Sequence, residues 1–190
     1  TQPGLKLLDA EPGIKRDLVL GAVITNERGD VVAGNGPDVK PGNPAEREQF
    51  MAHSERDTGK ALIGKPLLSR LTGQRSILIS RRINKPDGSF FGVVAVAIDP
   101  NYFTNIYPQV DLGKKGVIEL VGTDGVLRAR LSDNGGESGQ DGDSAELMKY
   151  ARANAHGGFA AVSKSDGVPR ILSYRTMREY PLIVSVGVAE

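Results

Sequence analysis

Three turns recur along the chain at a nearly constant interval. Each turn separates two short apolar runs and contains or adjoins a glycine or a proline. The matching turns lie at Gly29 and Gly125, at Gly73 and Gly167, and at Gly88 and Tyr180, so the intervals are 96, 94 and 92 residues. A repeated interval of this kind indicates an internal duplication, with two copies of roughly 90 residues each.

The two copies have the same predicted order of elements, which is two strands, one helix and three further strands. In the first copy the helix begins after an N-cap at Asn43 and ends near Glu55. In the second copy the helix begins after Asp143 and ends at Gly157 or Gly158. This order predicts an α+β fold of two tandem PAS-like modules, each an antiparallel five-stranded sheet with flanking helices.

The segment between the two copies is predicted to be structured. Phe103, Ile106 and Tyr107 lie at helical spacing within it, which indicates a packed linker helix. The predicted domains are a remnant of an N-terminal helical region at 1–17, a first module at 18–105, a linker at 106–115 and a second module at 116–190.

The composition limits the classes of function. Lysine and arginine number 24 against 23 acidic residues, so the net charge is +1, whereas nucleic-acid-binding domains carry an excess of cations. The chain has no cysteine, which excludes disulfides, thiolate catalysis and Cys-ligated metal. Its longest uncharged stretches, 88–98 and 100–110, are shorter than the roughly 18 apolar residues of a membrane span.

The chain lacks residues that known catalytic and metal-binding motifs require for their chemistry. Residues 59–65 fit the start of a Gly-x-x-x-x-Gly-Lys nucleotide loop, but Pro66 replaces the hydroxyl residue that holds Mg²⁺. The acidic segment 133–146 does not fit a calcium loop. The two histidines, His53 and His156, belong to no hydrolase or zinc-protease motif. The sequence therefore predicts a protein that is not an enzyme and that holds no metal or cofactor.

Four short segments carry a resemblance to a known family. They are 47–53 (Arg-Glu-Gln-Phe-Met-Ala-His), 63–66 (Ile-Gly-Lys-Pro), 80–83 (Ser-Arg-Arg-Ile) and 99–103 (Asp-Pro-Asn-Tyr-Phe). These segments resemble motifs of double Cache domains, the extracytoplasmic sensor domains of bacterial transmembrane receptors. The resemblance implies a periplasmic, small-molecule-sensing domain of a membrane-anchored histidine kinase, diguanylate cyclase or chemoreceptor. It also implies that the first module is membrane-distal and binds the ligand, and it allows a homodimer.

The resemblance further implies two ligand-binding residues. In members that bind amino acids, an Arg-x-Trp-Tyr helix motif grips the carboxylate and an aspartate after the last strand holds the amine. Arg47 matches the arginine and Asp99 the aspartate, whereas Gln49 and Phe50 replace the two aromatic residues. The implied partner is a small anionic or zwitterionic metabolite.

The residues themselves support a site at the same place. Arg47, Phe50 and His53 lie three residues apart on a helix. Arg47 offers a guanidinium that can bind a carboxylate, Phe50 an apolar ring that can cover the ligand, and His53 a titratable hydrogen-bond donor. Ser80 and Arg82 share one face of their strand. The predicted ligand-binding set is Arg47, Phe50, His53, Ser80, Arg82 and Asp99.

Structural roles for the same residues remain open. Ala95 and Ala97, which share a strand face with Asp99, could accommodate a packed helix, and Asp99 could cap the segment that begins at Asn101. Arg82 could face solvent on its strand. With an empty first module, the domain would serve only for protein interaction or dimerisation. The second module is expected to transmit rather than sense. Its helix offers Lys149 and Arg152 but no Arg-x-aromatic-aromatic run, and valines crowd its last strand, 182–188.

Overall fold

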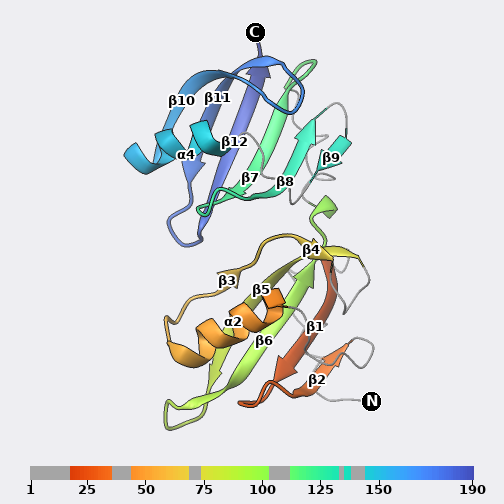
Figure 1. Ribbon diagram of the computed structural model, residues 1–190, viewed down its shortest axis with the longest axis vertical. Helices are drawn as coiled ribbons and strands as arrows, with labels where there is room; N and C mark the ends of the chain where they lie inside the picture. The colour runs from red at the N-terminus through yellow and green to blue at the C-terminus, as the bar shows by residue number, and fades with distance from the viewer. Residues whose placement is uncertain (1–17, 36–43, 69–73, 103–111, 133–134, 138–143) are drawn as a thin grey trace. The chain divides into compact units, whose positions relative to one another are not determined.

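The computed structural model describes residues 18–35, 44–68, 74–102, 112–132, 135–137 and 144–190 (Figure 1). The chain divides between Asp99 and Pro100 into two compact units, called unit 1 and unit 2. The predicted N-terminal helical remnant and most of the predicted linker helix lie outside the described residues.

The described residues of unit 1 form an antiparallel sheet with a helix on one face. Its elements are β1 (Val19–Thr25), β2 (Val31–Asn35), α2 (Pro44–Glu55), β3 (Leu62–Ile63), β4 (Leu67–Leu68), β5 (Arg75–Asn84) and β6 (Phe90–Ile98). The strand order is β2-β1-β6-β5-β3, and β4 also pairs with β5. Helix α2 packs across β5 and β6 (Figure 1).

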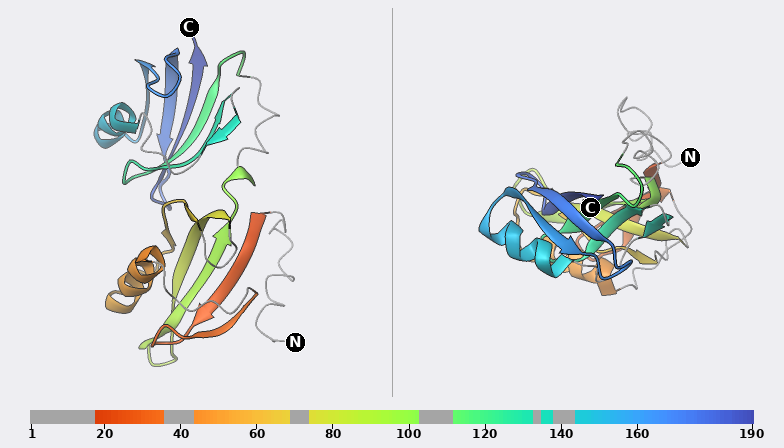
Figure 2. Two further views of the ribbon diagram at one scale, coloured as in Figure 1. Left: turned by 45° about the vertical axis from the view of Figure 1, so that its right-hand side comes forward. Right: turned by 90° about the horizontal axis from the view of Figure 1, so that it is seen from above.

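Unit 2 has the same plan. Its elements are β7 (Val117–Gly122), β8 (Leu127–Ser132), β9 (Gly135–Glu137), α4 (Ser144–Ala153), β10 (His156–Val162), β11 (Pro169–Thr176) and β12 (Leu182–Ala189). The strand order is β10-β11-β12-β7-β8-β9. In each unit the helix lies on one face of its own sheet, as a second direction of view also shows (Figure 2).

The strand orders of the two units correspond element by element. Matching β1, β2, β5 and β6 with β7, β8, β11 and β12 gives the same order of neighbours, which agrees with the predicted duplication. Each sheet has six strands rather than the predicted five. The difference arises at the edges, because β3 and β4 have two residues each and β9 has three, too few to show an alternating apolar pattern.

The backbone confirms the predicted turns at four glycines, Gly29, Gly88, Gly125 and Gly167, whereas the turn predicted at Gly73 lies outside the described residues. Gly29, Gly88 and Gly125 have φ angles of 85°, 82° and 82°, a region that side chains other than glycine rarely adopt. Helix α2 has the predicted bounds, whereas α4 ends at Ala153, before the predicted glycines. Gly157 lies in β10 instead, where a Cβ atom would stand 3.1 Å from the hydroxyl of Tyr174. That glycine therefore makes room for the Tyr174 ring and does not end the helix.

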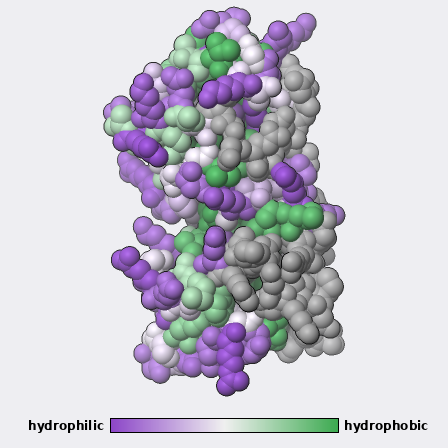
Figure 3. Space-filling model, in the orientation of Figure 1, coloured by the Kyte–Doolittle hydropathy of each residue, from purple (hydrophilic) through white to green (hydrophobic). Residues whose placement is uncertain are grey.

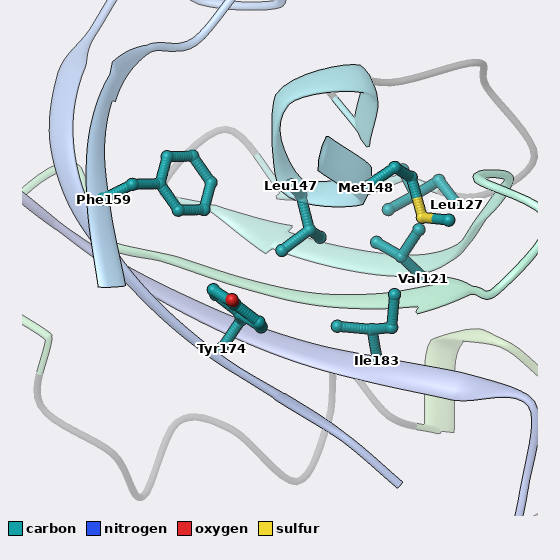
Figure 4. Packing of buried hydrophobic residues seen from close by; sticks show 7 residues of the cluster. All are labelled: Val121, Leu127, Leu147, Met148, Phe159, Tyr174 and Ile183. Carbon is teal, nitrogen blue, oxygen red and sulfur yellow. The ribbon is translucent and has the colours of Figure 1, made fainter. Parts of the chain in front are cut away.

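The core of unit 2 lies between α4 and its sheet. Leu147 and Met148 of α4 point towards side chains of the sheet (Figure 4). The cluster consists of Val121, Leu127, Leu147, Met148, Phe159, Tyr174 and Ile183. In unit 1 the corresponding cluster is smaller and contains Leu78, Ala95 and Ala97, packed against Leu20 and Val23.

One face of the molecule shows how hydrophilic and hydrophobic residues are distributed. On the face shown in Figure 3, hydrophobic residues form small groups separated by hydrophilic ones. Within the described ranges, none of the helices has the length and apolar character needed to cross a membrane.

Candidate functional site

Helix α2 turns a polar face towards its sheet. Its most buried described side chain is His53, which is 1% exposed. The His53 Nε2 atom lies 3.0 Å from the Ser80 hydroxyl, and Ser80 is 2% exposed on β5. Two residues of the predicted site are thus in direct contact inside unit 1.

Arg82 connects β5 to the end of α2. Its Nη1 atom donates to the backbone carbonyls of His53 and Ser54, at 2.5 and 3.2 Å. These carbonyls belong to the last turn of the helix, which has no partners of its own for them. The guanidinium also lies 4.7 Å from the centre of the Phe90 ring. Arg82 therefore anchors the helix end and does not face solvent.

Phe50 also packs against Phe90 of β6. Its ring centre lies 5.6 Å from that of Phe90, in an edge-to-face arrangement with an interplanar angle of 71°. Phe50 therefore contacts β6 on the side of the sheet that α2 covers, next to the Arg82 guanidinium.

Gln49 is part of this polar face, although the sequence indicated it only as a replacement for an aromatic residue. Its Nε2 atom donates to the Leu78 carbonyl at 3.2 Å. A Cβ atom at Gly64 would lie 2.7 Å from that Nε2 atom, so the glycine makes room for the amide. The Oε1 atom is buried and has no hydrogen-bond partner among the residues that the structure describes. Its position four residues before His53 was the signal that could have identified it.

The strand register places the other predicted residues. Ser80 pairs with Ala95 and Leu78 with Ala97, so small side chains of β6 lie beside the polar pair. Since Gln49 contacts Leu78 and His53 contacts Ser80, α2 runs in the same direction as β5. Its first turn therefore lies towards the end of the sheet where β6 stops.

Arg47 and Asp99 lie at this end of unit 1. Arg47 is in the first turn of α2, and its side chain is outside the described residues. Asp99 follows β6, and its backbone N–H donates to the Leu18 carbonyl at 3.0 Å. The structure thus brings Phe50, His53, Ser80 and Arg82 together. It places the backbone of Arg47 and Asp99 farther along unit 1, towards the end of the sheet where β6 stops.

Burial lowers the pKa of His53 below its ordinary value of 6.5. The loss of hydration disfavours the imidazolium, and the neighbouring Arg82 charge acts in the same direction. The hydrogen bond with Ser80 and the carboxylate of Asp57 oppose the shift without reversing it. His53 is therefore neutral in the folded protein at neutral pH.

The protein should lose stability as the pH falls below about 6.5. In that range the unfolded state binds a proton at His53 that the folded state resists, so the free energy of unfolding decreases with decreasing pH. Denaturant unfolding at about pH 7.5 and about pH 5.5, compared with His53→Gln, measures this contribution. An equally large decrease in His53→Gln would assign the effect to other groups.

Unit 2 contains a cavity of about 310 Å³ between α4 and its sheet. Its lining includes Glu119, Arg130, Lys149, Phe159, Ala161 and Arg170. The valines of β12 do not block it. Ile183 belongs to the cluster under α4, so Val184, Val186 and Val188 lie on the opposite face of the sheet. Of the two reasons given for a transmitting second module, the crowding by valines is therefore wrong.

Two buried arginines share one carboxylate at this cavity. Arg170 donates from Nη1 and Nη2 to the two oxygens of Asp166, at 2.8 and 2.7 Å. Arg130 Nη2 donates to the same carboxylate at 3.3 Å and to the Ser163 hydroxyl at 3.2 Å. Hydrogen bonds from Arg170 hold the pKa of Asp166 well below its usual range. Asp166 is therefore ionised at any physiological pH.

One solved structure decides the family. The extracellular domain of the putative histidine kinase rpHK1S-Z16 is 31% identical, with a TM-score of 0.82 over 97% of this chain and 74% of that chain. The chain belongs to the Cache-type extracellular sensor domains that occur in histidine kinases and chemoreceptors. The family model of dCache_1-like histidine kinase sensor domains matches residues 100–187 of this sensor domain.

More distant structures share the fold of this sensor domain. The ligand-binding domain of the Pseudomonas aeruginosa amino-acid chemoreceptor PctB, in complex with L-Arg, is 15% identical, with a TM-score of 0.63 over 99% of this chain and 79% of that chain. That of PctC from the same organism, in complex with GABA, is 17% identical, with a TM-score of 0.57 over 94% and 77%. No sequence among the curated proteins matches the chain.

Proposed function

We propose that the chain is the periplasmic sensing part of a double Cache receptor that is anchored in the inner membrane. Unit 1 is the membrane-distal module and binds a small anionic or zwitterionic metabolite. Unit 2 connects it to the cytoplasmic output, a histidine kinase in the first instance. The domain binds its ligand and does not transform it.

The polar inner face of α2 is the observation that carries this proposal. A helix on a sheet normally buries an apolar stripe, and α4 does so with Leu147 and Met148. At the corresponding place, α2 buries His53 and directs Gln49 to the backbone of β5. Buried polar groups cost stability unless they are paired, so a polar layer here is more useful for recognition than for packing.

The chemistry of this layer suits a zwitterion. Within the described ranges the buried Oε1 atom of Gln49 is an acceptor without a partner, and an ammonium group would supply the donor. Arg47 offers charge-assisted paired hydrogen bonds to a carboxylate. Asp99 lies at the same end of unit 1 and matches the family aspartate that holds an amine. Relatives of the same fold are solved with asparagine, GABA and L-Arg, which supports an amino-acid-like ligand.

Arg47→Ala should weaken ligand binding at least tenfold. A charged hydrogen-bond pair contributes about 1.5 to 3 kcal/mol, and about 1.4 kcal/mol is one decade in affinity. The probes are L-asparagine, GABA, L-arginine and succinate, first screened by thermal shift. A ligand at about 100 times its Kd adds about 2.7 kcal/mol, which raises the Tm by several degrees. Calorimetric titration then gives the affinities.

Two further variants sharpen this test. Arg56→Ala removes an exposed arginine just after α2 and should leave the affinity unchanged. Asp99→Asn removes a charge at nearly constant shape, so amine-bearing probes should bind more weakly while succinate does not. If none of the probes raises the Tm, or if Arg47→Ala binds as the wild type does, a protein-interaction role replaces sensing in unit 1.

A further inference from the structure

The cavity of unit 2 combines buried positive charge with an apolar wall. The α4 side of the sheet is apolar around Val121 and Ile183. Along β7 it changes to Glu119, which pairs with Arg130 on β8. The cavity lies over this charged half of the sheet face. It belongs to unit 2 alone and so goes beyond the site proposed in unit 1.

The charges around the cavity leave it positive. Arg130, Arg170, Lys149 and Lys164 line it against two carboxylates, those of Glu119 and Glu146. Asp166 adds a third carboxylate behind the two arginines, which leaves an excess of one positive charge. Since buried guanidinium groups are stable only beside anions, this balance favours an anionic occupant.

The two arginines are held in place before anything binds. Arg170 Nε donates to the Lys115 carbonyl at 2.8 Å, while both of its Nη atoms are bound by Asp166. A Cβ atom at Gly187 would lie 3.2 Å from Arg170 Cδ and 2.8 Å from Val117 Cγ1, so the glycine makes room for this arginine against the sheet. Groups fixed in this way bind an anion without a further loss of side-chain entropy.

Arg130 retains an unused donor. The side chain is 4% exposed, and its buried Nε atom has no hydrogen-bond partner in the described part of the chain. Glu119 Oε1 lies 3.7 Å from that atom, which is an ion pair and too long for a hydrogen bond. An oxygen of a bound carboxylate would satisfy it.

The apolar wall of the cavity determines the chemistry of the ligand beyond its anionic group. Phe159, Ala161 and Leu172 are apolar and lie on the same face of β10 and β11. A volume of about 310 Å³ is at the small end of ligand pockets. We infer that unit 2 has a binding site of its own for a small organic carboxylate with a short apolar body.

The test uses hexanoate and phenylacetate as probes for the complete 190-residue chain. Calorimetric titration should show that both bind, while hexanol and hexylammonium, which lack the carboxylate, do not. Ala161→Leu fills the cavity and should weaken hexanoate binding at least tenfold. Ala160→Leu is the matched control, because the neighbouring side chain is exposed and points to the other face of β10.

A second pair of variants tests the charge without touching the packing. Lys149→Gln removes a cation from the cavity lining and should weaken hexanoate binding about threefold, the range of an exposed ion pair. Arg152→Gln removes an exposed cation of the same helix that does not line the cavity, and should have no effect. These exposed positions keep the test valid if Ala161→Leu fails to fold.

Several results would overturn the inference. They are a Kd of about 1 mM or weaker for both probes, equal binding of hexanol, or equal affinities of Ala161→Leu and Ala160→Leu. Arg47→Ala separates this site from the one in unit 1. Hexanoate binding should survive that change, and its loss there would place the probe in unit 1 and refute a site in unit 2.

Discussion

Asp166→Asn is expected to destabilise unit 2 by about 3 to 5 kcal/mol, the usual cost of removing one partner from a buried ion pair. The side chains of Arg130 and Arg170 are 4% and 2% exposed, and both bind this carboxylate. Asparagine has nearly the same shape but no charge, so two buried guanidinium groups would lose their shared counter-ion. Hydrogen exchange of the β11 and β12 amides, compared with those of β5 and β6, measures the loss in unit 2.

The control for this variant is an exposed ion pair. Glu27 and Lys85 lie 3.8 Å apart with side chains 47% and 40% exposed, so Glu27→Gln should change stability by less than about 1 kcal/mol.

The pH dependence of stability in acid is a second control. The folded pKa of Asp166 is lowered, so its contribution is complete above the unfolded value of 3.8 and is lost as the pH falls from there towards the folded pKa. A difference between wild type and Asp166→Asn that persisted in strong acid would contradict the charge argument.

Leu147→Ala should destabilise unit 2 by about 2 to 5 kcal/mol, because the lost burial leaves a cavity that the rigid sheet cannot close. Leu147 is 2% exposed and points from α4 towards Tyr174 and Ile183 of the sheet (Figure 4). It is also among the residues that line the cavity, so the same change should enlarge the proposed binding site. Denaturant unfolding followed by circular dichroism measures the loss.

Arg152→Ala is the matched control on the same helix. Its side chain is exposed, and exposed substitutions of this kind usually change stability by no more than about 0.5 kcal/mol. If Leu147→Ala were equally mild, α4 would not be fixed to the sheet by its apolar face. The assignment of the cavity as a formed site would then lose its main support.

Local sequence signals were sufficient to predict most of the turns and the start of helix α2. Gly29, Gly88 and Gly125 mark turns because only glycine adopts their φ angles without strain. Pro44 begins α2 because its fixed φ suits a first helical turn. Spacing also indicated that Phe50 and His53 share a helix face and that Ser80 and Arg82 share a strand face, whereas the contact between His53 and Ser80 came from the tertiary structure.

The partners of the charged residues were decided only by the tertiary structure. Nothing near Arg82 in the chain indicates that it binds the carbonyl of His53, 29 residues earlier. Arg130 likewise reaches Asp166 across 36 residues, and the cavity beside them depends on how α4 rests on the sheet. Turns and helix ends depend on neighbouring residues and their φ angles, so they can be read locally. A buried charge must find its counter-ion wherever packing brings one, and packing depends on the whole fold.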